Sequence, residues 1–242
     1  TGTTTGTEDT AYSYSITTSD DDSDSSDSWT ITCTTCPSWL SVSHTAGAST
    51  ATLSGTPLDA NVGANSVVIQ VADAASATGT ESFTITVANT NDAPSISSTA
   101  ITAVNEDAAY SYAITTSDDD SDSSDSWTIT STSVSWLTLT HTAGASTATL
   151  AGTPANGDVG SHSVTITVAD AAGLTDTETF TIVVTNTNDA PTISSTAVTS
   201  VDEDAAYSYT TTASDVDVGD TVTLTCTTVP AWLTCTAGAL SG

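Results

Sequence analysis

The chain has 242 residues, of which 29 are Asp or Glu and none is Lys or Arg, giving a formal net charge of −29. No acid can therefore pair with Lys or Arg inside the chain, and the neutralising charge must come from outside it. Such a charge argues against nucleic acid and anionic membrane surfaces as direct partners. No apolar run is long enough to span a membrane, so direct membrane insertion is not expected.

The predicted elements recur at a nearly constant period. Trp39 and Trp136 lie 97 residues apart, and Trp136 and Trp232 lie 96 apart. The run Asn-Thr-Asn-Asp-Ala-Pro begins at Asn89 and again at Asn186. A period of this length suits one small domain per repeat. We expect two full domains and a partial third, at residues 1–92, 93–189 and 190–242.

Within a repeat, the first predicted strand alternates apolar and hydroxyl residues, as in Tyr12-x-Tyr14-x-Ile16. A Trp-Leu pair, a Gly-Thr-Pro turn and two more alternating strands follow, as at Val67–Val71 and Phe83–Val87. Thr and Ser fill the outward positions, where Thr has good strand propensity. No stretch has helical periodicity. The pattern predicts an all-β fold of tandem immunoglobulin-like Greek-key β-sandwiches, with the Trp-Leu pairs filling each core.

The acids gather at the same places in each repeat. They cluster at Glu8-Asp9, residues 20–27 and Asp92, and the second repeat shows the same arrangement. Carboxylates beside Asn and backbone carbonyls are the ligands that a hard divalent cation prefers. The alternative is a polar linker with solvated loop acids. An EF-hand starting at Asp20 is excluded, because position six is Ser25 and position twelve is Ile31.

The ordered motifs resemble a known family. They read Glu-Asp-x-x-Tyr-x-Tyr, Ser-Asp-x-Asp, Trp-Leu, Leu-x-Gly-Thr-Pro, Val-Ala-Asp and Asn-x-Asn-Asp-Ala-Pro, and the set occurs twice in full. This resembles the cadherin-like repeats of large bacterial and archaeal surface proteins, including the dystroglycan-type subgroup. The similarity covers nearly the whole chain. It implies cadherin-like sandwiches arranged end to end, with Ca²⁺ between successive domains.

The resemblance also implies the calcium ligands. At the first junction they are Glu8, Asp59, Asn89, Asn91, Asp92, Asp118, Asp120 and Asp170. At the second junction they are Glu106, Asp158, Asn186, Asn188, Asp189, Asp215 and Asp217. Further acids in a Ser-Asp tract are expected to form a solvated loop rather than to hold another ion, and these are Asp21, Asp24, Asp27, Asp119, Asp122 and Asp125.

Four cysteines occur, at Cys33, Cys36, Cys226 and Cys235. An even number in a β-rich, secreted-looking chain favours disulfides, and three pairings are possible. Local pairing within each repeat is the simplest. A redox-active or zinc-binding Cys-x-x-Cys site is the alternative, but no βαβ context and no second nearby pair support it.

No catalytic constellation is recognised. His44 and His141 occupy the same repeated string, and the third repeat has no His there, so a turn residue is expected rather than a catalytic base. His162 has no obvious acid–base partner set. The Gly-x-Ser-x-Gly elbow, the zinc-protease His pair and phosphate-binding loops are all missing from the sequence. We therefore expect no enzymatic activity.

The sequence favours a calcium-stiffened spacer or fibre unit of an extracellular filament or giant adhesin, which would associate with itself, other surface proteins or glycans. A carbohydrate- or protein-binding sandwich, an accessory module of a secreted hydrolase, and ice binding through Thr-x-Thr are the alternatives. The third repeat stops at Leu240-Ser241-Gly242, before its last two strands. We expect these strands to follow in the natural polypeptide, and strand donation by a neighbouring subunit is the other possibility.

Overall fold

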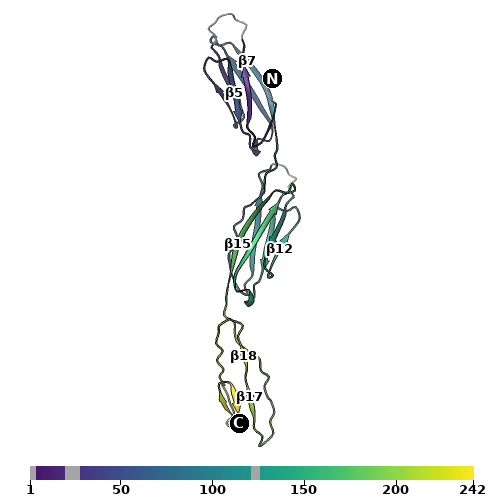
Figure 1. The fold of residues 1–242 in the computed structure, drawn as a ribbon, viewed down its shortest axis with the longest axis vertical. Helices are drawn as coiled ribbons and strands as arrows, with labels where there is room; N and C mark the ends of the chain where they lie inside the picture. Colours follow the sequence, from purple (N-terminus) through teal and green to yellow (C-terminus); the bar gives the residue numbers. More distant parts are fainter. Residues whose placement is uncertain (1–3, 20–27, 121–125) are drawn as a thin grey trace.

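In a computed structural model of the protein, residues 4–19, 28–120 and 126–242 are described. The chain forms three β-rich units placed end to end along one long axis (Figure 1). The predicted all-β sandwich fold is confirmed. Within the described ranges, no helix has the length and apolar character needed to cross a membrane.

The first unit is a sandwich of two sheets, ordered β1-β7-β6-β3 and β2-β5-β4. Its elements are β1 (Thr5–Thr7), β2 (Tyr12–Thr17), β3 (Thr30–Thr35), β4 (Leu40–His44), β5 (Thr50–Gly55), the 3-10 turn η1 (Asp59–Asn61), β6 (Gly63–Ala72) and β7 (Thr78–Ala88). The strands pair in antiparallel fashion except β1, which lies parallel to β7. Both sheets direct their apolar positions inward, as the alternation predicts.

The second unit repeats this plan, with sheets ordered β11-β14-β15-β9 and β12-β13-β10-β8. Its elements are β8 (Ser95–Ile96), β9 (Ala103–Asn105), β10 (Tyr110–Ser117), β11 (Thr128–Thr132), β12 (Leu137–His141), β13 (Thr147–Gly152), the 3-10 turn η2 (Asn156–Asp158), β14 (Gly160–Ala169) and β15 (Thr175–Thr185). Val164 faces Phe180 across the β14–β15 pair. The short strand β9 runs parallel to β15, as β1 does to β7.

Each of these two units has its own core. In the second unit Ile114, Leu150, Val164, Ile166 and Ile182 are fully buried. The Trp of each Trp-Leu pair packs edge-on against a Tyr of β2 or β10. The ring centroids of Tyr12 and Trp39, and those of Tyr110 and Trp136, are both 5.8 Å apart. The expected filling of the core by the Trp-Leu pair therefore holds in these units.

The third unit differs from the other two. It contains β16 (Thr192–Ile193), β17 (Ser208–Thr210), β18 (Ala213–Ser214), β19 (Thr234–Thr236) and β20 (Ala239–Ser241), in sheets ordered β16-β18 and β17-β20-β19. The expectation that Trp232 fills a core is wrong, because 56% of its surface is exposed. In the second unit, the sheet containing β14 and β15 packs over the Trp of the Trp-Leu pair. Residues 190–242 form no strands that match β14 and β15.

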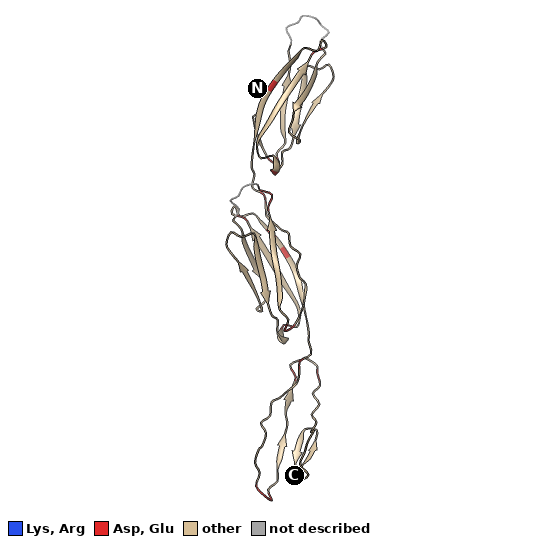
Figure 2. Ribbon diagram, turned by 180° about the vertical axis from the view of Figure 1, so that it is seen from behind, with Lys and Arg blue, Asp and Glu red and all other residues tan. Residues whose placement is uncertain are grey.

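Acidic residues lie mainly at the ends of the units and in the linkers between them (Figure 2). The exposed faces of the sheets carry mostly Ser and Thr instead. In the second unit, Thr165 and Thr167 on β14 stand opposite Thr179 and Thr177 on β15. Apart from a few acids on the strands, such as Glu178, the fold thus separates a hydroxyl-covered side surface from acidic junctions.

Candidate metal centres at the junctions

Glu8 follows β1 directly, in a turn held against the Gly-Thr-Pro loop. The Asp9 N–H donates to the Pro57 carbonyl at 2.9 Å, and Asp9 adopts a left-handed φ of 56°, which Asp tolerates better than most residues. This turn buries the Glu8 side chain, which is 1% exposed. Glu8 Oε1 accepts a hydrogen bond from the Thr90 N–H of the linker. Glu8 Oε2 is buried and has no hydrogen-bond partner among the described residues.

The linker and the loop after β10 bring two more carboxylates to Glu8. Asn89 Nδ2 donates to Asp120 Oδ1, and the Asp92 N–H donates to Asp120 Oδ2, each at 3.0 Å. Carboxylate oxygens of Glu8, Asp92 and Asp120 all lie within 4.8 Å of one another. Unit charges this close repel strongly in a partly buried site, so the group favours a bound cation.

Three further predicted residues surround this group. Asp59 and Asp118 line a cavity of about 400 Å³ together with Asp92. Asp59 Oδ1 and Asp118 Oδ2 are buried and lack a hydrogen-bond partner within the described part of the chain. Asp170 follows β14, and Asn91 Nδ2 donates to its Oδ2 at 2.7 Å. All eight residues that the resemblance assigned to the first junction therefore lie there.

The electrostatics of the first junction reflect this crowding. Burial raises the pKa of Glu8, and the charges of nearby carboxylates raise it further. Burial and neighbouring carboxylates likewise raise the pKa of Asp92 and Asp118. The pKa of Asp170 shifts the other way, because the hydrogen bond from Asn91 lowers it. Glu8, Asp92 and Asp118 are thus destabilised in their charged form without a counter-ion.

The second junction repeats the hydrogen-bond network. The buried Glu106 accepts from the Thr187 N–H at 2.6 Å, and Glu106 Oε2 lacks a partner among the residues described. Asn186 Nδ2 donates to Asp217 Oδ1 at 2.9 Å, and the Asp189 N–H donates to Asp217 Oδ2 at 2.7 Å. Oxygens of Glu106, Asp189 and Asp217 form a second group within 4.8 Å of one another.

Two further predicted residues of the second junction, Asn188 and Asp215, lie in the linker and in the loop after β18. Asp215 Oδ1 accepts from the Asp217 N–H at 3.1 Å, and Asn188 Nδ2 donates to the Asp189 carbonyl at 2.7 Å. Asp215 also forms a third acidic group with Asp217 and Asp220. Asp220 was not among the predicted ligands, although it follows the Ser-Asp-x-Asp motif at a short distance.

Asp158 has a different role from the one predicted for it. It occupies the third position of η2, where its Oδ2 accepts from the Ala155 N–H at 2.9 Å, as Asn61 Oδ1 does from the Leu58 N–H in η1. Asn156 takes the first position of η2, which Asp59 takes in η1. Aligning the two Gly-Thr-Pro motifs position by position, instead of acid to acid, would have found this.

The Ser-Asp tracts are only partly described. Asp119 lines the cavity at the first junction. The other acids named in these tracts lie outside the described residues, and these are Asp21, Asp24, Asp27, Asp122 and Asp125.

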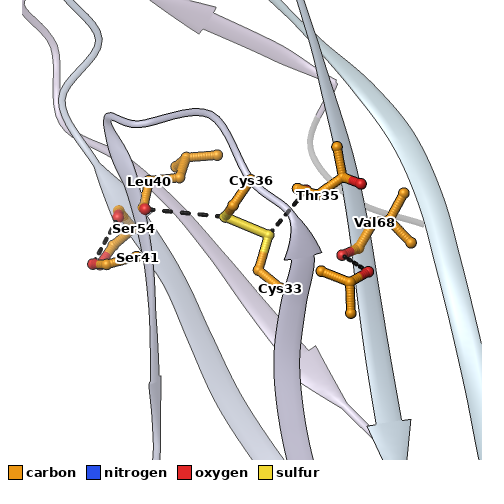
Figure 3. Close-up of a disulfide and its surroundings, with 8 residues drawn as sticks. Cys33, Thr35, Cys36, Leu40, Ser41, Ser54 and Val68 are labelled. Carbon is orange, nitrogen blue, oxygen red and sulfur yellow. Dashed lines mark hydrogen bonds between the residues drawn. A yellow bond between two sulfur atoms is a disulfide. The ribbon is translucent and has the colours of Figure 1, made fainter.

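The four cysteines form two local disulfides. Cys33 bonds to Cys36 at the end of β3, beside an irregularity in its pairing with β6 (Figure 3). Cys226 bonds to Cys235, and the Cα atoms are 6.4 Å apart. The local pairing, which was the simplest of the three possible pairings, is therefore confirmed. Neither pair leaves a thiol for metal binding.

The two repeated histidines end equivalent strands. His44 Nε2 hydrogen-bonds the Ala48 carbonyl, and His141 Nε2 the Ala145 carbonyl, each at 2.9 Å. Both rings therefore close a turn, as expected from their place in the repeated string.

The chemistry of the junctions matches a hard divalent cation. The donor atoms are carboxylate oxygens supported by Asn side chains, and a buried Glu at each junction keeps one oxygen without a hydrogen-bond donor in the described structure. Calcium takes about six to eight oxygen ligands, and carboxylates bind it through one or both oxygens. Soft-metal ligands are not present in either group.

Comparison with known proteins gives a consistent fold. A family model described as "Putative Ig domain" matches residues 1–88, 93–185 and 190–242. A search of curated proteins finds no match. Among solved structures, extracellular cadherin domains 3–6 of protocadherin gamma B2 match 98% of the chain and 62% of their own length, with 17% identity and a TM-score of 0.58. The protocadherin gamma B4 extracellular domain matches 88% of the chain and 37% of its own length, with 18% identity and a TM-score of 0.52.

An endo-fucoidan hydrolase of glycoside hydrolase family 107 also matches, over 76% of the chain and 27% of the enzyme, at 29% identity. Its TM-score of 0.35 is too low to support an argument. The chain spans 27% to 62% of the length of these three structures. The two cadherin structures show a shared fold of tandem cadherin-like sandwiches.

Proposed function

Because the chain belongs to the putative Ig domain family, with tandem cadherin-like units along its length, we propose that it is a calcium-stiffened spacer of an extracellular filament or adhesin. The units, taken as residues 1–92, 93–189 and 190–242, supply reach. The junctions supply stiffness once a divalent cation is bound. The two disulfides and the cadherin-like resemblance support a location outside the cell.

The buried glutamate at each junction carries this proposal. Glu8 and Glu106 are 1% and 2% exposed, and each has one oxygen without a hydrogen-bond partner in the described part of the chain. An ionised carboxylate is costly to bury unless it is paired or coordinates a metal. With no Lys or Arg in the sequence, a bound cation is the remaining counter-charge available at these sites.

The proposed ligands connect three segments at each junction. At the first, Glu8 and Asp59 come from the lower end of the first unit, Asp92 from the linker, and Asp118 and Asp120 from the upper end of the second. Calcium would supply the positive charge that these carboxylates share. The Asn side chains already orient Asp120 and Asp170, so the site is partly organised by hydrogen bonds.

Isothermal titration calorimetry with calcium on the chelator-treated chain tests the proposal. We expect binding with dissociation constants of about 10⁻⁴–10⁻³ M, the range of extracellular calcium modules. Glu8→Gln and Glu106→Gln should each remove part of the binding heat, because each removes one buried negative charge from one junction. Glu178→Gln is the matched control, since Glu178 accepts from the Tyr112 hydroxyl on the side of a sheet. Absence of calcium binding by the unaltered chain would refute the proposal.

A further inference from the structure

The two junctions share one hydrogen-bond network but differ at one turn. In both, a linker N–H donates to the buried Glu, a linker Asn donates to the second loop Asp, and a linker Asp N–H donates to the same Asp. The 3-10 turn before the long hairpin contributes Asp59 at the first junction and Asn156 at the second.

The two turn residues present opposite chemistry to the cluster. Asp59 Oδ1 is buried with no hydrogen-bond partner in the described chain, and its charge raises the pKa of Glu8. Asn156 instead donates from Nδ2 to Asp217 Oδ1 at 3.1 Å. The first junction therefore has an additional anionic oxygen, whereas the second has an amide N–H₂ group that already occupies a carboxylate oxygen.

We propose that this turn residue sets the calcium affinity of each junction, so that the first junction fills at a lower calcium concentration than the second. The proposal rests on the calcium-binding function above and concerns how its two sites differ. At intermediate calcium, the joint between the first two units is rigid while the joint to the third remains free to bend. The chain then stiffens in two steps.

The physical basis is ligand charge. Calcium affinity is tuned by the number of charged ligands, and a carboxylate offers two acceptor oxygens where an amide offers one. An amide N–H₂ group directed at the site must also rotate away before its oxygen can bind. Replacing one nearby unit charge by a neutral group in a partly solvated site changes affinity by about tenfold. Asp170 and Asp220 also lie at the first and second junctions, so the test must isolate the turn residue.

Hydrogen exchange of the full chain during a calcium titration reports each junction separately. Peptic peptides covering the linkers contain Thr90 and Thr187, whose N–H groups donate to Glu8 and Glu106. We expect the first linker to become protected at about a tenfold lower calcium concentration than the second. Peptides from β6, β7, β14 and β15 in the same experiment show whether each variant is folded.

Two substitutions of the turn residue identify its contribution to calcium affinity. Asn156→Asp should lower the calcium concentration at which the second linker is half protected by about tenfold, and should leave that of the first linker unchanged. Asp59→Asn should raise the midpoint of the first linker by a similar factor. Asp158→Asn removes a charge from the same turn as Asn156, but from its capping position, and should leave the second midpoint nearly unchanged.

The outcomes separate the two proposals. The two-step inference is wrong, and the calcium function stands, if calcium protects both linkers at the same concentration. The same holds if neither substitution changes the calcium concentration at which a linker becomes protected. A shift with Asp158→Asn as large as that with Asn156→Asp would assign the affinity to the net charge of the turn and overturn the role of its first position. If calcium protects neither linker, both proposals fail.

Discussion

At the scale of single residues, the buried glutamates connect sequence to function most directly. Glu8 and Glu106 open the same motif, and the turn after each begins with an Asp in a left-handed conformation, with φ of 56° at Asp9 and 58° at Asp107. The turn places the preceding Glu in a buried position instead of in solvent. Burial raises the pKa of Glu8, a cost that the proposed calcium ion would offset.

The first two units differ in the hydrogen bonding of the core Trp. Trp39 Nε1 donates to Asn65 Oδ1 at 3.1 Å, but the equivalent position in the second unit is His162. The His162 ring meets Trp136 at a centroid distance of 6.1 Å, and Trp136 Nε1 is buried with no hydrogen-bond partner in the described chain. An unsatisfied buried N–H group lowers stability.

His162→Asn should therefore stabilise the second unit. The new amide would accept from Trp136 Nε1 and still donate to the Asp158 carbonyl, as Asn65 does to the Asn61 carbonyl. We expect the free energy of unfolding of this unit to rise by about 1 kcal/mol. The slowest-exchanging amides of β14 measure it under native conditions. Unchanged or faster exchange would contradict the assignment of Trp136 as unsatisfied.

At the scale of elements, apolar alternation was sufficient to predict the long strands. The expected strands at Val67–Val71 and Phe83–Val87 lie within β6 and β7, and the Tyr-x-Tyr strand is β2. Alternation works here because each sheet buries one face and exposes the other. The short parallel strands β1 and β9 were not predicted, because three residues carry too little pattern.

The candidate site was predictable where residue type and backbone position agree. The linker Asn and Asp residues and the loop Asp pair form fixed motifs, and the structure places them together. The resemblance assigned Asp158 to the second junction as the counterpart of Asp59, yet Asn156 takes that turn position in η2. The exposure of Trp232 was likewise unpredicted, because its core depends on strands far from it in sequence.

The Gly of the Gly-Thr-Pro motif is required by a close approach of two strands. A Cβ atom on Gly152 would lie 1.9 Å from the Trp136 carbonyl oxygen, since Gly152 pairs with both Tyr110 and Leu137. Gly152→Ala should lower the free energy of unfolding of the second unit by about 1–3 kcal/mol through backbone displacement.

Gly157→Ala is the matched control for this change, because a Cβ there meets nothing within 4 Å. Denaturant unfolding followed through hydrogen exchange of the β14–β15 pair compares the two variants. Equal stability of the two variants would contradict the steric argument.

At the scale of the whole molecule, charge and shape are arranged together. The units lie end to end, and acids from both neighbouring units meet at each junction (Figures 1 and 2). Ser and Thr dominate the described sheet faces. We therefore expect an added cation to act mainly at the junctions. The third unit exposes Ile193, Val198 and Trp232, and none of the hydrophobic side chains in residues 190–242 is buried.

We propose that calcium at the junctions fixes the relative orientation of the units. Carboxylates that repel one another in the metal-free chain would let the linkers bend, while the cores of the first two units keep these sandwiches folded. The variant carrying both Glu8→Gln and Glu106→Gln should lose the response to calcium, because both junctions then lack their buried anion.

Small-angle X-ray scattering of the full chain in millimolar calcium, and again after chelation, tests this claim most directly. We expect an extended particle with a narrow range of lengths in calcium, and a shorter average length with a broader range after chelation. The β signal in circular dichroism should persist in both states. Identical scattering profiles with and without calcium would contradict the account.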